Sequence, residues 1–186
     1  MIKIIKMSDN TKDYIEAFYR IFDEMKSSME AVTPTQSIAA NHINRMIPFY
    51  EAEIAMSENI LKYTTEVEIE ALAKSFITEA TANIETLRAL KEVCNDNDSE
   101  RDLFLYEKGY NDAFSRMIRE MSSTPSSNNL NANFLYEMIP HHEGGMNMNK
   151  NLLKFNVCEQ LRSHAEEAIM SGQVELDQMK SLLRKF

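Results

Sequence analysis

Two stretches of the sequence carry the same pattern of apolar side chains. Residues 14–29 read YIEAFYRIFDEMKSSM, and residues 106–121 read YEKGYNDAFSRMIREM. In the first stretch tyrosine, phenylalanine and methionine recur at intervals of four, four, three and four residues, which places them on one face of a helix. The second stretch repeats these intervals. Each stretch therefore predicts an amphipathic helix with one buried face.

The correspondence extends along the chain when positions 92 residues apart are compared. The tripeptide Met46-Ile47-Pro48 then falls on Met138-Ile139-Pro140. Further identities pair Asn41 with Asn133, Glu51 with Glu143, Met56 with Met148, Asn59 with Asn151 and Leu61-Lys62 with Leu153-Lys154. Chance would scatter such identities, so we infer two copies of one helical unit. Copy one spans about residues 10–94 and copy two about residues 100–186, and together they form a single domain.

Each copy is predicted to contain three helices. The first helices cover residues 10–32 and 100–122, and the polar loop 95–99 opens the second of them. Two longer hairpins follow at roughly residues 34–92 and 127–185. Their helices are expected to start at Thr33-Pro34, near Thr65, at Thr124-Pro125 and near Asn156. Short connections make sequential helices antiparallel neighbours, so the expected class is all-α: two hairpins related by a pseudo-twofold axis, with the shorter first helices packed on them.

The composition fits one well-packed domain and excludes several classes of partner. The chain has 186 residues, 44% of them apolar, with 13 methionines and no tryptophan, which is typical of a soft helical interior. The net charge is −9 and the pI is about 5.0. Nucleic acid and anionic membranes are therefore not expected partners, because both attract basic proteins.

The location is predicted from hydropathy and cysteine usage. No stretch is long and apolar enough for a membrane span or a secretory signal. The two cysteines, Cys94 and Cys158, form no CxxC pair and imply no disulfide framework, so reduced thiols are expected. We predict a cytoplasmic protein, or an exported one if a leader has been removed.

The segment from Asn133 to Met148 contains the residues best suited to bind a metal. Met138, His142 and Met146 are spaced four and four residues apart, so two thioethers and an imidazole share one helix face. These donors suit Cu(I) or Ag(I) better than calcium or magnesium. His141 points about 100° away from His142, with Glu137 one turn earlier as a group that would orient its ring. The alternative is that the methionines fill the core and the histidines are structural.

The last predicted helix supplies a second set of inward residues. Gly172, Glu175 and Met179 fall on one side of this helix, so a carboxylate and a thioether face inward. Glu175 either completes a site with the histidines or is a buried glutamate bonded to a facing histidine or tyrosine. Copy one has Phe49-Tyr50 in place of the two histidines, and Ile54, Thr81, Asn83 and Leu87 in place of Met146, Gln173, Glu175 and Met179. We therefore interpret copy one as a scaffold and copy two as the competent half.

The run Met138-Ile-Pro-His-His-Glu-Gly, with Met148 and then Gln173-Val-Glu175-Leu-Asp-Gln-Met179, resembles the signature of the bacterial domain-of-unknown-function 305 family. The resemblance covers about residues 130–186, and residues 35–92 match as a degenerate copy. It implies a ferritin-like four-helix bundle built from two hairpins. Several members are linked to copper binding. The ligands it implies here are Met138, His141, His142, Met148, Glu175 and Met179.

Two functional hypotheses follow. The first is a copper-binding protein that holds Cu(I) or Ag(I) without turnover, through Met138, His141, His142, Met146, Met148, Glu175 and Met179. The second is a metal-free structural or interaction bundle, for example a homodimer with a methionine-rich surface. A di-iron enzyme would need Glu three residues before His, and no histidine here has one. No nucleophile motif is present either, so we do not expect an enzyme.

Overall fold

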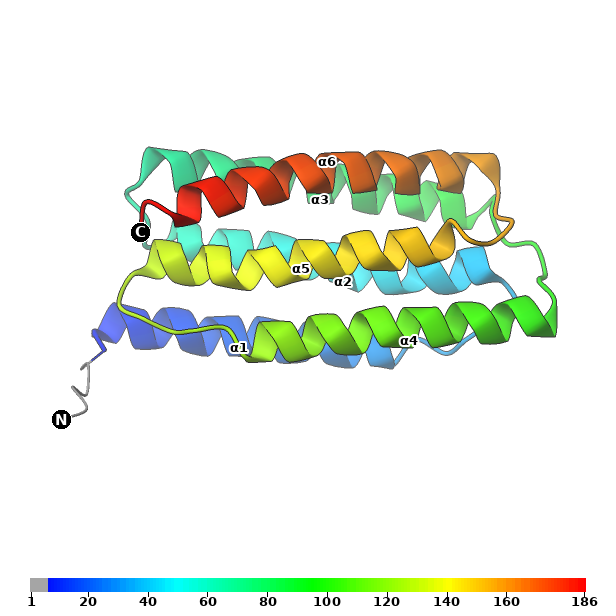
Figure 1. Cartoon of the computed structure of the whole chain (residues 1–186), viewed down its shortest axis with the longest axis horizontal. Coiled ribbons are helices and arrows are strands. Elements are labelled where there is room, and N and C mark those ends of the chain that lie inside the picture. The colour runs from blue at the N-terminus through cyan, green and yellow to red at the C-terminus, as the bar shows by residue number, and fades with distance from the viewer. Residues whose placement is uncertain (1–6) are drawn as a thin grey trace.

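The structure, a computed structural model, describes residues 7–186, and in that range it is all-α, with six helices and no strand. The helices are α1 (Asp9–Glu30), α2 (Ile38–Leu61), α3 (Val67–Lys91), α4 (Glu100–Ser122), α5 (Leu130–Leu152) and α6 (Glu159–Leu183). They lie in three layers of two, with α3 and α6 in one outer layer, α2 and α5 in the middle, and α1 and α4 in the other outer layer (Figure 1). The predicted all-α class is confirmed.

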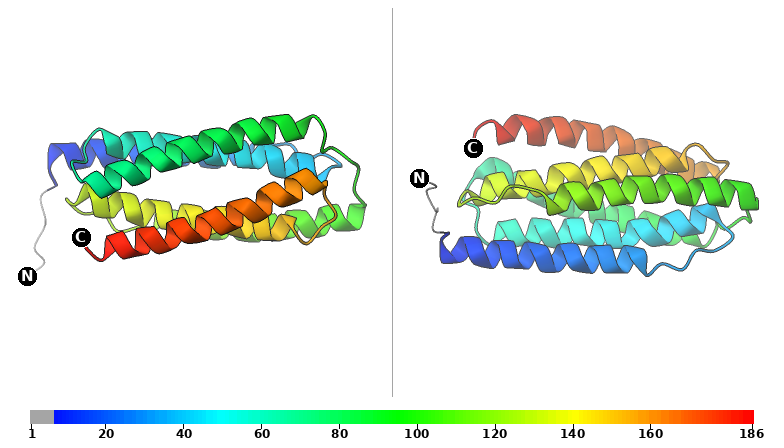
Figure 2. Two further views of the ribbon diagram at one scale, coloured as in Figure 1. Left: turned by 90° about the horizontal axis from the view of Figure 1, so that it is seen from above. Right: turned by 60° about the horizontal axis from the view of Figure 1, so that its bottom comes forward.

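The middle layer explains which helices are buried most. Packing is closest between α2 and α3, between α5 and α6, and between each first helix and the second helix of its own copy. Helices α2 and α5 also pack against each other, so side chains all around them are buried, polar ones included. The outer helices bury one stripe each, as the tyrosine–phenylalanine–methionine pattern of α1 and α4 predicted. Helices α3 and α6 run side by side with little direct contact (Figure 2).

Equivalent hydrogen bonds recur in the two copies. The side-chain amide of Asn59 donates to the backbone oxygen of Tyr14 at 3.0 Å, and that of Asn151 donates to the backbone oxygen of Tyr106 at 3.0 Å. Both bonds tie the second helix of a copy to its first helix. The 92-residue correspondence of the sequence therefore recurs in these two contacts.

The second helix of each copy starts later than predicted. Its N-cap residue is Ser37 in copy one and Asn129 in copy two, rather than Thr33 and Thr124. The cause is Asn41, whose side chain accepts a hydrogen bond from the backbone nitrogen of Thr35 and donates to its backbone oxygen. Such side-chain bonds to the backbone replace helical ones and hold the preceding loop in a non-helical form. Asn133 makes the equivalent bonds to Ser127 in copy two.

The first helices have close to their predicted lengths. Helices α1 and α4 have 22 and 23 residues and α5 has 23, so the first helices are nearly as long as the helices of the two hairpins. The starts of α3, α4 and α6 lie where the sequence indicated them.

The prediction of two free thiols is wrong, because Cys94 and Cys158 form a disulfide with their Cα atoms 5.7 Å apart. Cys94 follows the end of α3 and Cys158 is the N-cap residue of α6. The antiparallel course of these helices brings the two ends together. The argument for a cytoplasmic location from reduced thiols therefore fails, since disulfides are rare there. Within residues 7–186 no helix is both long and apolar enough to cross a bilayer.

Candidate functional site

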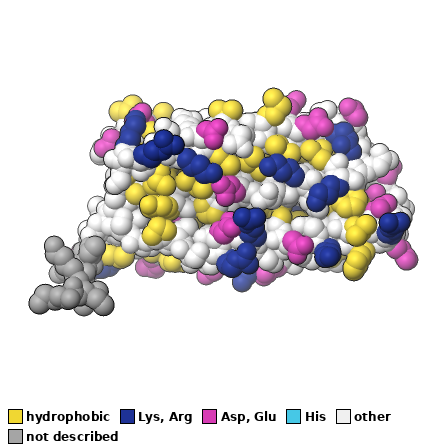
Figure 3. All heavy atoms as spheres, viewed as in Figure 1, with side chains coloured by type: hydrophobic (Ala, Val, Ile, Leu, Met, Phe, Trp, Pro, Cys, Tyr) yellow, Lys and Arg dark blue, Asp and Glu magenta, His cyan; other side chains and the backbone are white. Residues whose placement is uncertain are grey.

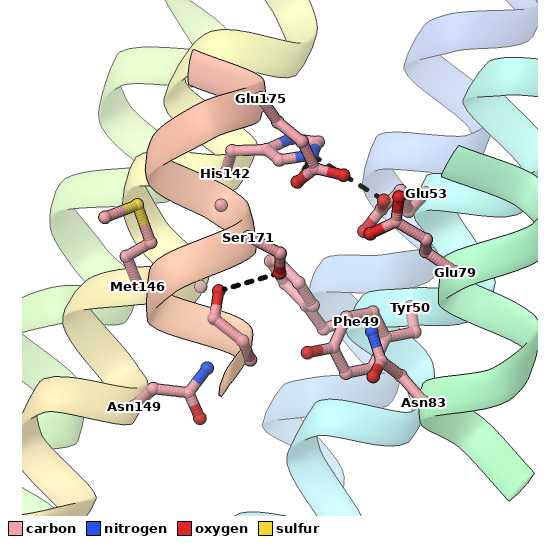
Figure 4. A pocket seen from close by; sticks show the side chains of 13 residues that line it. Phe49, Tyr50, Glu53, Glu79, Asn83, His142, Met146, Asn149, Ser171 and Glu175 are labelled. Carbon is pink, nitrogen blue, oxygen red and sulfur yellow. Dashed lines mark hydrogen bonds and ion pairs between the residues drawn. The ribbon is translucent and has the colours of Figure 1, made fainter. Parts of the chain in front are cut away.

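A polar pocket lies where α2, α3, α5 and α6 meet. Its cavity measures about 30 Å³, which is room for a water molecule or a single ion. We call it the central pocket (Figure 4). Each of the four helices contributes one glutamate or histidine side chain to it: Glu53 from α2, Glu79 from α3, His142 from α5 and Glu175 from α6. These four groups are called the pocket cluster below.

The imidazole of His142 is the centre of the pocket cluster. Its Nδ1 donates to the backbone oxygen of Met138 at 3.0 Å, which fixes the ring and leaves Nε2 facing the cavity. Nε2 lies 3.2 Å from Glu175 Oε2 and 3.6 Å from Glu53 Oε1, as the ion pairs drawn in Figure 4 indicate. The contact with Glu53 is too long for a hydrogen bond and the contact with Glu175 does not have its geometry, so this buried nitrogen has ion-pair contacts but no hydrogen-bond partner.

Burial and mutual charge set the protonation of the pocket cluster. Burial alone would lower the pKa of His142, but the carboxylates of Glu53 and Glu175 raise it to about 9. Burial raises the pKa of Glu53 to about 7, although the charge of His142 acts in the opposite direction. Burial and the neighbouring Glu175 also raise the pKa of Glu79. The pKa of Glu175 is lowered, because its contact with His142 outweighs the effect of burial. Near neutral pH the cluster thus contains an imidazolium–carboxylate pair, His142 and Glu175.

His141 does not reach the central pocket. Its ring stacks on Phe49 with centroids 3.9 Å apart, and its Nε2 donates to the backbone oxygen of Phe49 at 3.2 Å. Burial lowers the pKa of His141 well below its ordinary value. The prediction that Glu137 orients this ring is wrong, since Glu137 instead accepts a hydrogen bond from the hydroxyl of Tyr14 on α1. On the face shown in Figure 3 no histidine side chain is visible, in agreement with the burial of His141.

The predicted sulfur ligands are placed in different surroundings. Met138, Met148 and Met179 are fully buried in the hydrophobic core and do not line the central pocket. Met146 does line it, packing its side chain over Gly172, where a Cβ atom would lie 3.1 Å from Met146 Cγ. In Figure 4 the Met146 side chain lies across the ribbon of α6 from Glu53. Of the seven predicted ligands, the pocket brings together three: His142, Met146 and Glu175.

Glu53 and Glu79 were missed because both belong to copy one, which we had interpreted as a scaffold. That interpretation is wrong for the central pocket. The two glutamates correspond in copy two to Gly145 and Ser171, so a comparison centred on the copy-two donors could not find them. The available signal was the place of Glu53 on the buried side of α2, four residues after Phe49. A charged residue at such a position needs a partner.

Equivalent positions of the two copies line the central pocket, but they carry different side chains. His142 and Tyr50 are equivalent residues of the two copies, as are Glu175 and Asn83, and all four line the central pocket. Equivalent positions of the two copies therefore meet in one pocket. Within the described range no group of three or more histidine, cysteine, aspartate or glutamate side chains is arranged to hold a metal ion. A metal site here would need Met146 as a donor besides His142 and Glu175.

Comparison with known proteins agrees with the resemblance seen in the motif. Residues 107–183 match the family described as Domain of unknown function (DUF305), so this part of the chain is a DUF305 domain. The fold is similar to the crystal structure of a DUF305 fragment from Deinococcus radiodurans, with a TM-score of 0.59 and 14% sequence identity. The match covers 83% of this chain and 100% of that one, and at this identity it shows the fold alone. No curated protein matches the chain.

Proposed function

We propose that this protein binds a copper ion in the central pocket and holds it without turnover. The observation that carries the proposal is the Nε2 atom of His142, which is buried, has no hydrogen-bond partner and lies 3.2 Å from the Glu175 carboxylate. In the imidazolium form this nitrogen carries a proton, which a metal ion displaces when it coordinates the ring, so binding should release a proton. The nitrogen of His142, the carboxylate of Glu175 and the thioether of Met146 would hold the ion.

The mixture of donors supports copper over calcium or magnesium. Imidazole nitrogen is a borderline ligand, thioether sulfur favours Cu(I), and carboxylate oxygen favours Cu(II). Met146 is buried against Gly172, and its unbranched side chain has three rotatable bonds through which its sulfur could be reoriented toward an ion. His142 already makes the type of second bond that metal-ligating histidines make, from Nδ1 to a backbone oxygen.

Binding rather than catalysis is proposed because of the size of the pocket. A cavity of about 30 Å³ accommodates an ion but no organic substrate. We also infer that the hairpins α2–α3 and α5–α6 form a ferritin-like four-helix bundle, with α1 and α4 packed on its α2–α5 layer. The equivalent Asn59 and Asn151 hydrogen bonds support this pseudo-symmetric arrangement. The Cys94–Cys158 disulfide argues for a location outside the cytosol.

A metal-free structural protein is the second candidate. It is favoured by the ion pair between His142 and Glu175, which already compensates part of the buried charge. It is also favoured by the burial of Met138, Met148 and Met179, which makes these side chains core residues. In this account the pocket cluster would specify how the four helices pair and would bind no metal ion.

A competition titration distinguishes the two candidates. Cu(I), under anaerobic conditions, and Cu(II) would each be titrated into the protein in the presence of a chromophoric chelator. We expect one copper ion per chain and at least a hundredfold weaker binding in His142→Ala. His164→Ala is the matched control, because His164 lies on α6 but does not line the pocket, and it should bind like the wild type.

Two results would contradict the assignment. Absence of binding by the folded wild-type protein would favour the metal-free structural protein. An equal loss in His141→Ala and His142→Ala would instead favour the larger ligand set implied by the family motif, with His141 as a ligand. Circular dichroism of each variant verifies that the helices are intact.

A further inference from the structure

The N-terminal half of α6 has fewer large buried side chains than the C-terminal half, although Ile169 packs against the core and Arg162 donates to the backbone oxygen of Phe155 at 2.7 Å. Between Glu159 and Gly172 the buried side chains of α6 are those of Leu161 and Ala165, and Gly172 adds no side chain. The C-terminal half buries Leu176, Met179 and Leu182. Because apolar burial stabilises roughly in proportion to area, the first half gains less from fully buried side chains than the second.

The wall of the central pocket includes this part of α6. Ala168, Ser171 and Gly172 line the pocket, and Glu175 follows one turn later. Across the pocket stands α3, which makes little direct contact with α6. The disulfide joins α3 to α6 at one end of the outer layer, and the ion pair of Lys185 with Glu68 joins them at the other. That ion pair is exposed, and pairs of this kind contribute little.

The disulfide attaches the start of α6 to a well-fixed part of the chain. Cys94 is buried, and its backbone nitrogen donates to the backbone oxygen of Leu90 at 2.8 Å. The loop after Cys94 is anchored in turn by Asp98, whose carboxylate accepts a hydrogen bond from the backbone nitrogen of Ile38 at 2.7 Å. On the other side, Cys158 occupies the N-cap of α6 without forming a side-chain capping bond. The covalent bond thus stands where a cap would otherwise hold the helix end.

We propose that the Cys94–Cys158 disulfide is a redox latch that holds the N-terminal half of α6 over the central pocket, and that reduction by a dithiol releases it. The claim that the latch controls copper retention rests on the proposed function. The latch itself does not depend on any metal. The latch is closed where disulfides persist and opens where dithiols are abundant.

The chemistry of opening is thiol–disulfide exchange. Cys158 is partly exposed and Cys94 is buried, so the thiolate of the reductant attacks the sulfur of Cys158. A mixed disulfide forms with Cys158, and the sulfur of Cys94 leaves as a thiolate and takes up a proton. The second thiol of the reductant then attacks its own bound sulfur and releases Cys158 as a thiol. The protein gains two electrons and two protons, and the dithiol becomes a disulfide.

Hydrogen–deuterium exchange of the metal-free protein tests the latch. The oxidised wild type, the wild type reduced with dithiothreitol, and the C94S/C158S variant would be compared. We expect amides of residues 162–172 to exchange at least tenfold faster in the reduced protein and in the variant. Amides of residues 176–183 should change less than threefold. If the variant does not fold, the reduced wild type decides the question.

Two exchange results would overturn the latch. One is a change of less than twofold at residues 162–172 on reduction. The other is faster exchange throughout all six helices, because the disulfide would then support the whole fold rather than one half of α6.

Copper release to a chelator is measured separately with C94S/C158S, which brings no free thiol that would itself bind copper. Release should be at least tenfold faster than from the oxidised wild type, and an equal rate would reject control of copper retention. If neither protein binds copper, the proposed function fails, and the exchange result still decides the latch.

Discussion

The two copies of the helical unit contribute opposite chemistry to one pocket. Copy two supplies His142 and Glu175, where copy one has Tyr50 and Asn83. Copy one supplies Glu53 and Glu79, where copy two has Gly145 and Ser171. All of these side chains or backbones line the same cavity. The polar groups are divided between the two halves of the chain, so neither copy makes the pocket cluster alone.

A second pair of equivalent positions shows the same division. Arg45 on α2 is buried and pairs with Glu107 of α4, with Arg45 Nη2 2.7 Å from Glu107 Oε2. The equivalent residue on α5 is Glu137, which is bonded to Tyr14 of α1. In copy one this position therefore holds a cation, Arg45. In copy two it holds Glu137, which is largely protonated at neutral pH because burial raises its pKa to about 8. Each side chain ties a middle-layer helix to the outer helix of the other copy.

Exchanging the polar pair between the copies should have the largest effect. His142→Tyr combined with Glu175→Asn gives copy two the residues of copy one, and Tyr50 and Asn83 show that such side chains are accommodated at equivalent positions. We expect copper affinity to fall at least a hundredfold, or about 2.7 kcal/mol, in the competition titration.

The reverse exchange makes this test sharper. Adding Tyr50→His and Asn83→Glu to that variant should raise the affinity again by at least tenfold, because Tyr50 and Asn83 line the same pocket at the equivalent positions of copy one. Unchanged affinity after the first exchange would remove His142 and Glu175 from the site.

Glu137 should cause a pH dependence that Arg45 cannot. Burial is the main cause that raises the pKa of Glu137 from 4.5 to about 8, so between these values the folded protein binds more protons than the unfolded chain. Stability therefore falls as the pH rises through this window, by up to about 1.4 kcal/mol per pH unit from this group. Glu137→Gln should remove this slope in urea unfolding at pH 5.5, 6.5 and 7.5.

Tyr14→Phe provides the control for this prediction. The hydrogen bond from Tyr14 lowers the pKa of Glu137, so its loss should extend the slope to higher pH. An identical pH profile in Glu137→Gln and wild type would mean that Glu137 ionises freely in the fold.

Gly145 should tolerate a side chain poorly, although its copy-one equivalent is Glu53. A Cβ at Gly145 would lie 2.5 Å from Cζ of Phe49, whose ring is stacked on His141. Gly145→Ala should therefore cost about 1–2 kcal/mol in urea unfolding, after allowance for the better helix propensity of alanine. Gly172→Ala, which meets only the flexible Met146, should be close to neutral. Equal effects of the two changes would argue against tight packing at Phe49.

The smallest effect is expected at the open end of the outer layer. Glu68→Gln breaks the exposed ion pair with Lys185 and should change the free energy of unfolding by less than about 0.5 kcal/mol. A loss above about 1 kcal/mol in urea unfolding would show that this end holds α3 and α6 together more firmly than we infer.

The sequence predicted the helices well because their apolar patterns are long and regular. The stripe from Tyr14 to Met29 is buried as expected, and so is its copy from Tyr106 to Met121. The starts of α2 and α5 were misplaced because Asn41 and Asn133 bind the preceding loops through their side chains. A cap residue alone does not reveal such a contact six residues away.

The site was predicted only in part for a related reason. His142, Met146 and Glu175 were found from helical spacing, which places residues on one face of one helix. Glu53 and Glu79 come from the other copy, and helical spacing carries no information about how two copies meet. The disulfide was missed for the same reason, since Cys94 and Cys158 are 64 residues apart and only the packing of α3 and α6 joins them.

Anomalous X-ray diffraction at the copper edge, from crystals of the copper-loaded protein, tests the central claim most directly. The account predicts one anomalous peak in the central pocket, within bonding distance of Nε2 of His142. A peak elsewhere on the protein, or no peak at copper concentrations that saturate binding in solution, would contradict it.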